Sequence, residues 1–234
     1  MRFPSRLLAA NMWLAVFAWL AYLVIITLVT VAIAIWGDLD ESVWEKAVQL
    51  TRWYALFVGV ALVTEFLPLF IAHGQSRRQF GFQAAVTIAV FAPFLAFLLV
   101  ISFLLEALLY GLTGWTWALG QAHLFTAPTQ APMIFLEYTV MFVAWLVAGV
   151  LVSAAFYRWQ GGGLLAIIPA AVMVLFVQST IGDKMPLPFI TFQLGFNLPD
   201  SALGAVLAAA GTFVVGLGLT WLIIRDVPLR NKVS

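Results

Sequence analysis

Long apolar runs with almost no charge constrain this chain more than any other feature of its sequence. Six such runs occur along the 234 residues, at about 12–36, 53–73, 82–105, 134–157, 164–179 and 203–224. About 20 apolar residues in a helix cross the hydrocarbon of a bilayer, and a helix satisfies its own backbone hydrogen bonds there. The runs are continuous, whereas a membrane barrel needs alternation. The sequence predicts an all-α integral membrane protein with six transmembrane helices in one domain, 1–234.

Composition excludes several other classes of protein. Hydrophobic residues make up 64% of the chain and charged residues 9%, whereas soluble domains are about 45–50% apolar and about 25% charged. The net charge of +1 creates no field that would attract nucleic acid, so no nucleic-acid partner is expected. Because the chain has no cysteine, disulfides, thiolate catalysis and Cys-ligated metals are excluded.

The few basic residues predict the orientation of the helices. With six spans, both termini lie on the same side of the membrane. Three basic residues, Lys46, Arg52 and Lys184, fall on the opposite side. The others fall on the side of the termini: Arg2, Arg6, Arg77, Arg78, Arg158, Arg225, Arg230 and Lys232. Since Lys and Arg accumulate on the cytoplasmic side, we expect both termini to be cytoplasmic.

The connections on the outer side are expected to contain short amphipathic or re-entrant segments. Ser42-Val-Trp-Glu45 matches a capping box, which predicts a short amphipathic helix on the outer surface ahead of Arg52. The stretches 106–133 and 181–199 are too apolar for free loops. We expect both to dip into the outer leaflet or to cap a cavity from outside.

No set of residues indicates an enzyme. The two histidines, His73 and His123, are predicted on opposite sides, so they cannot form one metal site. The chain has no P-loop, no zinc-protease motif and no nucleophile elbow. We therefore expect no catalytic residue, no metal and no cofactor in this chain. Glu106 and Glu137 lie near outer helix ends, where water is expected to reach them.

Glu65 is the one acidic residue deep inside a predicted span. An ionisable group there is costly and is a functional candidate by default. Glu65 is a candidate for a translocation path, or it is a protonated or paired carboxyl that fixes helix packing. Three prolines, Pro68, Pro93 and Pro169, each interrupt a different span and predict kinks.

A stripe of small residues marks the last span. It consists of Gly204, Ala208, Thr212 and Gly216, spaced four residues apart on one helical face. Small residues let helix backbones approach closely in lipid. The stripe predicts helix packing, either within one subunit or at a dimer seam.

The segment between the second and third spans, His73-Gly-Gln-Ser-Arg-Arg-Gln-Phe-Gly81, is the most informative. Gly74 can end one helix, and Ser76 can cap the next. Arg77 and Arg78 beside Phe80 form either a docking site for another protein or a plain positively charged turn.

The pattern G-x-S-R-R-x-F, with Phe66-Leu-Pro68 upstream, resembles membrane subunits of bacterial ABC transporters of the ABC-2 type. The resemblance implies a permease subunit in the bacterial cell (inner) membrane, working as a homodimer or with a related permease subunit. A separate ATPase subunit would bind ATP and Mg. The coupling region would comprise Gly74, Gln75, Ser76, Arg77, Arg78, Gln79 and Phe80, and 181–199 would be an outer re-entrant element.

Two other functions remain open from the sequence. One is a non-transporting membrane scaffold or regulatory subunit, and the other is an ion-driven carrier that uses Glu65 as a proton relay. Because the chain lacks an E-A-A-type loop like that of many ABC importers, the resemblance favours an exporter.

Overall fold

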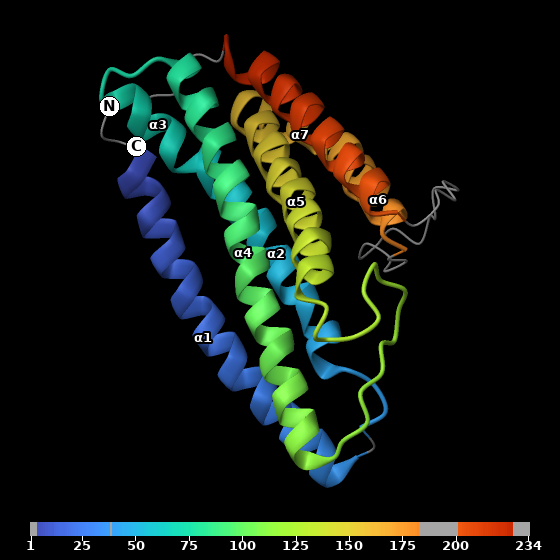
Figure 1. The fold of residues 1–234 in the computed structure, drawn as a ribbon. Helices are drawn as coiled ribbons and strands as arrows, with labels where there is room; N and C mark the ends of the chain where they lie inside the picture. Colours follow the sequence, from blue (N-terminus) through green and yellow to red (C-terminus); the bar gives the residue numbers. More distant parts are fainter. Residues whose placement is uncertain (1–3, 38, 183–200, 227–234) are drawn as a thin grey trace.

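The computed structural model describes residues 4–37, 39–182 and 201–226. Within these ranges the regular structure is helical, and no strand occurs. The helices are α1 (Pro4–Trp36), α2 (Val43–Thr64), α3 (Phe66–Ala72), α4 (Arg77–Thr113), α5 (Ala131–Trp159), α6 (Ile167–Thr180) and α7 (Ala202–Ile224). A short 3₁₀ helix, η1 (Gln160–Ala166), precedes α6. They form an elongated bundle (Figure 1).

Five helical stretches are long and apolar enough to cross a membrane: Asn11–Trp36, Val43–Ala72, Arg77–Thr113, Ala131–Thr180 and Ala202–Ile224. The multi-pass membrane architecture predicted from the apolar runs is therefore confirmed at this level. The fourth stretch, of 50 residues, contains α5, η1 and α6. Its chain direction changes at Gln160, which has a positive φ of 51°. α6 has 14 residues and is only about 21 Å long.

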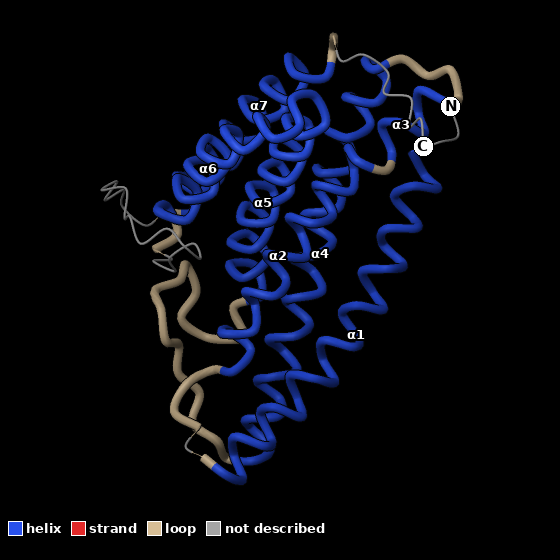
Figure 2. Tube along the Cα trace, turned by 180° about the vertical axis from the view of Figure 1, so that it is seen from behind, coloured by secondary structure: helices blue, strands red, loops and turns tan. Residues whose placement is uncertain are grey.

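The two ends of the bundle differ in their connections. We call the end that contains the 73–76 turn, Trp159 and Arg225 the turn end. We call the other end, where the 114–130 segment connects α4 to α5, the loop end. Figure 2 shows this long loop running beside the start of α2. The first described turns of α1 and the last turn of α7 both lie at the turn end (Figure 1).

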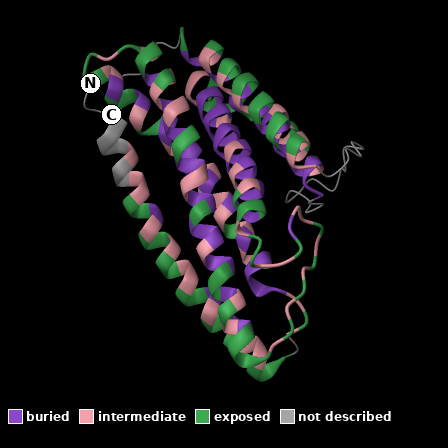
Figure 3. Cartoon of the chain, in the orientation of Figure 1, coloured by how far each residue is buried: buried purple, intermediate pink, exposed green. Residues whose placement is uncertain are grey.

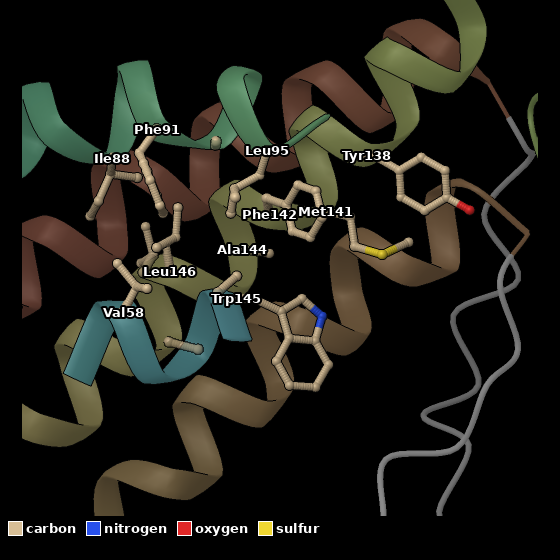
Figure 4. Packing of buried hydrophobic residues seen from close by; sticks show 14 of the residues in the cluster. Val58, Ile88, Phe91, Leu95, Tyr138, Met141, Phe142, Ala144, Trp145 and Leu146 are labelled. Carbon is tan, nitrogen blue, oxygen red and sulfur yellow. The ribbon is translucent and has the colours of Figure 1, made fainter. Parts of the chain in front are cut away.

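α5 is the central helix. It packs against α2, α4, α6 and α7, and 78% of the most apolar window of the 131–180 stretch is buried, compared with 11% in α1. Figure 3 shows the same contrast between the two helices. Phe142 and Leu146 of α5 meet Val58 of α2 and Phe91 of α4 in one apolar core (Figure 4).

A glycine pair sets the distance between α2 and α5. A Cβ added at Gly59 would overlap the carbonyl oxygen of Leu146, and its distance to Gly149 Cα would be 3.1 Å. A Cβ added at Gly149 would overlap the carbonyl oxygen of Leu56. The two helix backbones therefore touch where they cross, which small residues permit.

One expectation about α2 needs correction, and the disturbance predicted from Pro68 occurs. The predicted surface helix ahead of Arg52 is wrong, because α2 is continuous from Val43 and this segment is its first half, with Trp44 and Val48 buried. At the other end, the helix breaks at Glu65 before α3 begins. Pro68 explains the break, since it cannot donate a hydrogen bond to the carbonyl of Thr64.

The other two prolines lie inside helices. Pro93 lies within α4, which stays helical over 37 residues. Pro169 is the third residue of α6, where the missing N–H has no helical acceptor to lose. Neither proline therefore ends its helix.

Candidate functional site

The loop end holds a buried polar cluster that joins four segments distant in the sequence. We call it the loop-end cluster. Its members come from the start of α2, the end of α4, the 114–130 loop and the start of α5: Ser42, Glu45, Glu106, Trp117, His123 and Glu137. Charged and polar side chains are rarely buried unless they are paired, so their hydrogen bonds decide what the cluster can do.

His123 lies between two carboxylates. Its Nδ1 is 2.6 Å from Glu137 Oε1, and its Nε2 is 3.2 Å from Glu45 Oε1. Only the protonated imidazole can donate from both nitrogens. The exposed fractions of the three side chains are 3% for His123, 6% for Glu45 and 0% for Glu137. The ring of His123 also stacks on Phe125, with centroids 4.8 Å apart.

The charge of His123 follows from these contacts. Burial lowers the pKa of His123, but its hydrogen bonds to Glu137 and Glu45 and their negative charges outweigh burial and raise that pKa to about 9. His123 is therefore an imidazolium at neutral pH. It acts as the counter-ion of the two glutamates inside the protein.

Backbone amides of the same loop complete the pairing of the carboxylates. Leu124 N donates to Glu137 Oε2 over 2.7 Å, and Gly120 N donates to Glu45 Oε2 over 2.8 Å. The carboxylates of α2 and α5 thus hold the 114–130 loop on both sides of His123. The cluster closes the loop end of the bundle.

Glu106 forms the second half of the cluster. Ser42 Oγ donates to Glu106 Oε1 over 2.6 Å, and Trp117 Nε1 donates to Glu106 Oε2 over 3.3 Å. Ser42 Oγ also accepts from Glu45 N at 3.0 Å and so caps α2. One hydroxyl therefore fixes the start of α2 and links it to α4.

The expectation that Glu106 and Glu137 face water at helix ends is wrong. Both residues are completely buried, because the 114–130 loop folds over them. Sequence reasoning missed the cluster because it compared His123 only with His73. The signal was an excess of acids, Glu45, Glu106 and Glu137, at predicted helix ends around one histidine.

The side chains of the loop-end cluster are not arranged as metal ligands. In the described ranges 4–37, 39–182 and 201–226, no group of three or more His, Cys, Asp or Glu could hold a metal ion. Glu45, His123 and Glu137 are buried and paired with one another, while the buried Glu106 is hydrogen-bonded to Ser42 and Trp117. The hydrogen bonds of the cluster hold the 114–130 loop against α2, α4 and α5.

The 74–80 segment at the turn end comprises the turn between α3 and α4 and the first four residues of α4. Gly74 has φ +71° and follows α3, with Gln75 N bonded to Phe70 O and Gly74 N bonded to Ile71 O. This is the Schellman arrangement, in which glycine removes the steric cost of the left-handed residue. Ser76 then caps α4 through a reciprocal capping box with Gln79.

The side chains of this turn face different ways. Phe80 is 3% exposed and packs edge-to-face on Phe70, with centroids 5.6 Å apart. It therefore fixes the turn to the bundle. Arg77 donates to the carbonyl of Arg225 at the end of α7 over 2.8 Å. Arg78 and Gln79 are exposed, so these two side chains are accessible to a partner.

Arg77 and Arg158 both donate hydrogen bonds to carbonyl groups at the end of α7. Arg77 bonds to Arg225 O, and Arg158 bonds to Ile223 O over 2.8 Å. The last carbonyls of a helix have no helical partner and carry partial negative charge. The guanidinium groups supply both hydrogen bonds and positive charge, which ties α4, α5 and α7 together at the turn end.

Glu65 lies at the break between α2 and α3 and is exposed on the surface of the bundle. It does not contribute to the loop-end cluster, and it lines neither the cavity beside α1 nor the two cavities near the turn end. The small-residue stripe of α7 faces inward for the most part, with Ala208, Thr212 and Gly216 buried and Gly204 half-buried. A Cβ at Gly216 would overlap Val147 of α5.

The predicted outer element 181–199 falls almost entirely outside the described residues.

Comparison of the chain with protein-family models, curated proteins and solved structures finds no match. The function is therefore argued from the chain's own sequence and geometry.

Proposed function

We propose that this chain is the membrane permease subunit of an ATP-driven transporter of the ABC-2 type, and that it exports its substrate. A separate ATPase subunit binds ATP and Mg and docks on the turn 74–80. Two copies of the chain, or one copy and a related permease subunit, form the pathway. The assembly lies in the bacterial cell (inner) membrane.

The observation that carries this proposal is the construction of the turn. A Schellman motif, a capping box and the Phe70–Phe80 contact hold it rigid, while Arg78 remains exposed. A rigid element with an exposed arginine suits docking, since arginine is enriched at the energetic centres of interfaces. A flexible turn would absorb the motion of a partner instead of passing it on.

α4 supplies a mechanical connection from this turn to the other end of the bundle. It begins at Arg77 and continues for 37 residues, about 55 Å, to beyond Glu106. Glu106 in turn bonds to the cap of α2 through Ser42. A push on the turn would therefore reach the loop-end cluster through one continuous helix. ATP binding would shift the cluster from the paired arrangement described above toward one in which these hydrogen bonds are broken.

The distribution of charge supports the orientation. The turn-end termini of α4, α5 and α7 carry Arg77, Arg78, Arg158 and Arg225, with Asp226 beside Arg225. The loop-end parts of α2, α4 and α5 carry Glu45, Glu106 and Glu137 besides Lys46 and Arg52. Because positive residues accumulate on the cytoplasmic side of membrane proteins, this excess supports a cytoplasmic turn end, where an ATPase would meet it. The proposal includes α6, together with η1, as the fifth of six spans and both termini as cytoplasmic.

The test uses the charge reversal Arg78→Glu in the purified complex of the chain with its ATPase subunit. Arg78 donates no hydrogen bond that holds the bundle together, so the fold should persist while ATPase binding or ATP-dependent transport is lost. Arg77→Glu is less informative, because it also removes the bond to Arg225. Lys46→Glu, at an exposed lysine of the loop end, is the matched control.

Unchanged assembly and coupling in Arg78→Glu would refute the docking role. Transport that needs no ATPase but is abolished by Glu65→Gln would instead establish an ion-driven carrier. A chain that binds no ATPase and moves no substrate would be a scaffold.

A further inference from the structure

A cavity of about 280 Å³ lies between α1 and the neighbouring helices of the bundle. Its walls come from α1, α2, α4 and α5 and include Ala15, Ala18, Trp19, Tyr22, Tyr54 and Phe142. No charged side chain lines it. Small-molecule sites are concave, mostly apolar and about 300–1,000 Å³ in volume, so this cavity has the character and nearly the size of such a site.

Two tyrosine hydroxyls in the wall have no hydrogen-bond partner within the described part of the chain. They belong to Tyr22 of α1 and Tyr54 of α2, and both oxygens are buried. The neighbouring polar groups are satisfied, since Trp19 Nε1 donates to Ser102 Oγ over 2.8 Å and Thr51 Oγ1 donates to Val48 O over 2.7 Å. A buried hydroxyl without a partner is costly, so a ligand that accepts these hydrogen bonds would be favoured.

The position of α1 determines where a ligand would come from. Among the described helices, α1 packs only against α2 and α4. Its outer face exposes large apolar side chains such as Trp13, Phe17 and Leu28. That face belongs in the hydrocarbon phase. A molecule dissolved in the bilayer therefore meets the cavity at the edge of α1, without crossing a polar surface.

We propose that this cavity binds a neutral, lipophilic small molecule with a hydrogen-bond acceptor, which enters from the hydrocarbon phase beside α1. The walls contain no charged side chain, and the nearby Glu106 is already hydrogen-bonded to Ser42 and Trp117, so the cavity favours a neutral ligand. The hydroxyls of Tyr22 and Tyr54 orient the polar group of the ligand. The inference goes beyond the proposed function, since binding to this chain requires no ATPase.

The test is photolabelling of the purified chain in detergent with a diazirine analogue of decanol, followed by mapping of the labelled peptides. We expect saturable labelling of cavity residues on α1, α2, α4 or α5, and competition by decanol. Removing one hydroxyl by Tyr22→Phe or Tyr54→Phe should weaken binding about fivefold. Tyr157→Phe, outside the cavity, should leave binding unchanged.

A second variant keeps the test independent of the hydroxyls. Ala18→Phe places a large side chain at the α1 wall of the cavity and should abolish saturable labelling. Its circular dichroism spectrum should remain that of the parent. Ala210→Phe, on an exposed position of α7, is the matched control. Labelling spread over all exposed apolar faces, or unaffected by Ala18→Phe and by both tyrosine variants, would overturn the proposal.

Discussion

Deprotonation of His123 should weaken the fold, because this side chain is the counter-ion of two buried glutamates. Its nitrogens lie 2.6 Å from Glu137 Oε1 and 3.2 Å from Glu45 Oε1. When the proton leaves, one of these hydrogen bonds loses its donor. If both carboxylates are ionised, they also lose the positive charge between them.

The pKa of His123 determines the size and the pH range of this effect. It rises from 6.5 to about 9 in the folded protein, because the two glutamates outweigh the opposing effect of burial. A difference of this size corresponds to about 3 kcal/mol of stability. Since the folded pKa is the higher one, this stability is fully present below pH 6.5 and is lost as the pH rises through about 9.

The assay is SDS-induced unfolding of the chain in detergent micelles, followed by circular dichroism at about pH 6 and about pH 10. The parent should lose up to about 3 kcal/mol more than His123→Gln between the two conditions, because glutamine cannot titrate. His73→Gln, at an exposed histidine, should behave like the parent. Equal pH dependence in the parent and in His123→Gln would refute the account of the loop-end cluster.

Three further substitutions test the packing and the caps. Gly149→Val should destabilise the chain by at least about 1–3 kcal/mol in the same unfolding assay, whereas Gly211→Val should cost much less, because no atom lies within 4 Å of its added Cβ. Ser42→Ala should cost about 1–2 kcal/mol, since it removes the cap of α2 and the bond to Glu106. Arg158→Ala should lower the free energy of local opening in the last turn of α7 by about 0.5–1 kcal/mol. Amide hydrogen exchange in that turn, measured by mass spectrometry, should become correspondingly faster.

Local features were predictable from the sequence. The apolar runs are long enough to specify helices by themselves, so predicting these helices required no knowledge of tertiary contacts. Gly74 and Ser76 indicated where one helix ends and the next begins, and both cap their helices as predicted. Each of these features depends on residues within about one helical turn.

Features that depend on pairing across the sequence were not predictable. The Ser42 pattern indicated a helix start correctly, but the side chain of Glu45 contacts Gly120 and His123 instead of the cap. Those partners lie 75 and 78 residues away. The contact of Gly59 with Gly149 is equally non-local, since a single glycine in a helix does not identify the helix that approaches it.

Docking of an ATPase subunit on the turn 74–80 is the central claim, and site-specific cross-linking tests it most directly. Because the chain has no cysteine, His73→Cys places a single thiol beside the turn, and Thr113→Cys places one at the loop end. With a thiol-to-amine cross-linker in native membranes, we predict capture of a nucleotide-binding ATPase subunit from position 73 but not from position 113, and loss of that product on adding Arg78→Glu. No ATPase product from position 73, or equal products from both positions, would contradict the account.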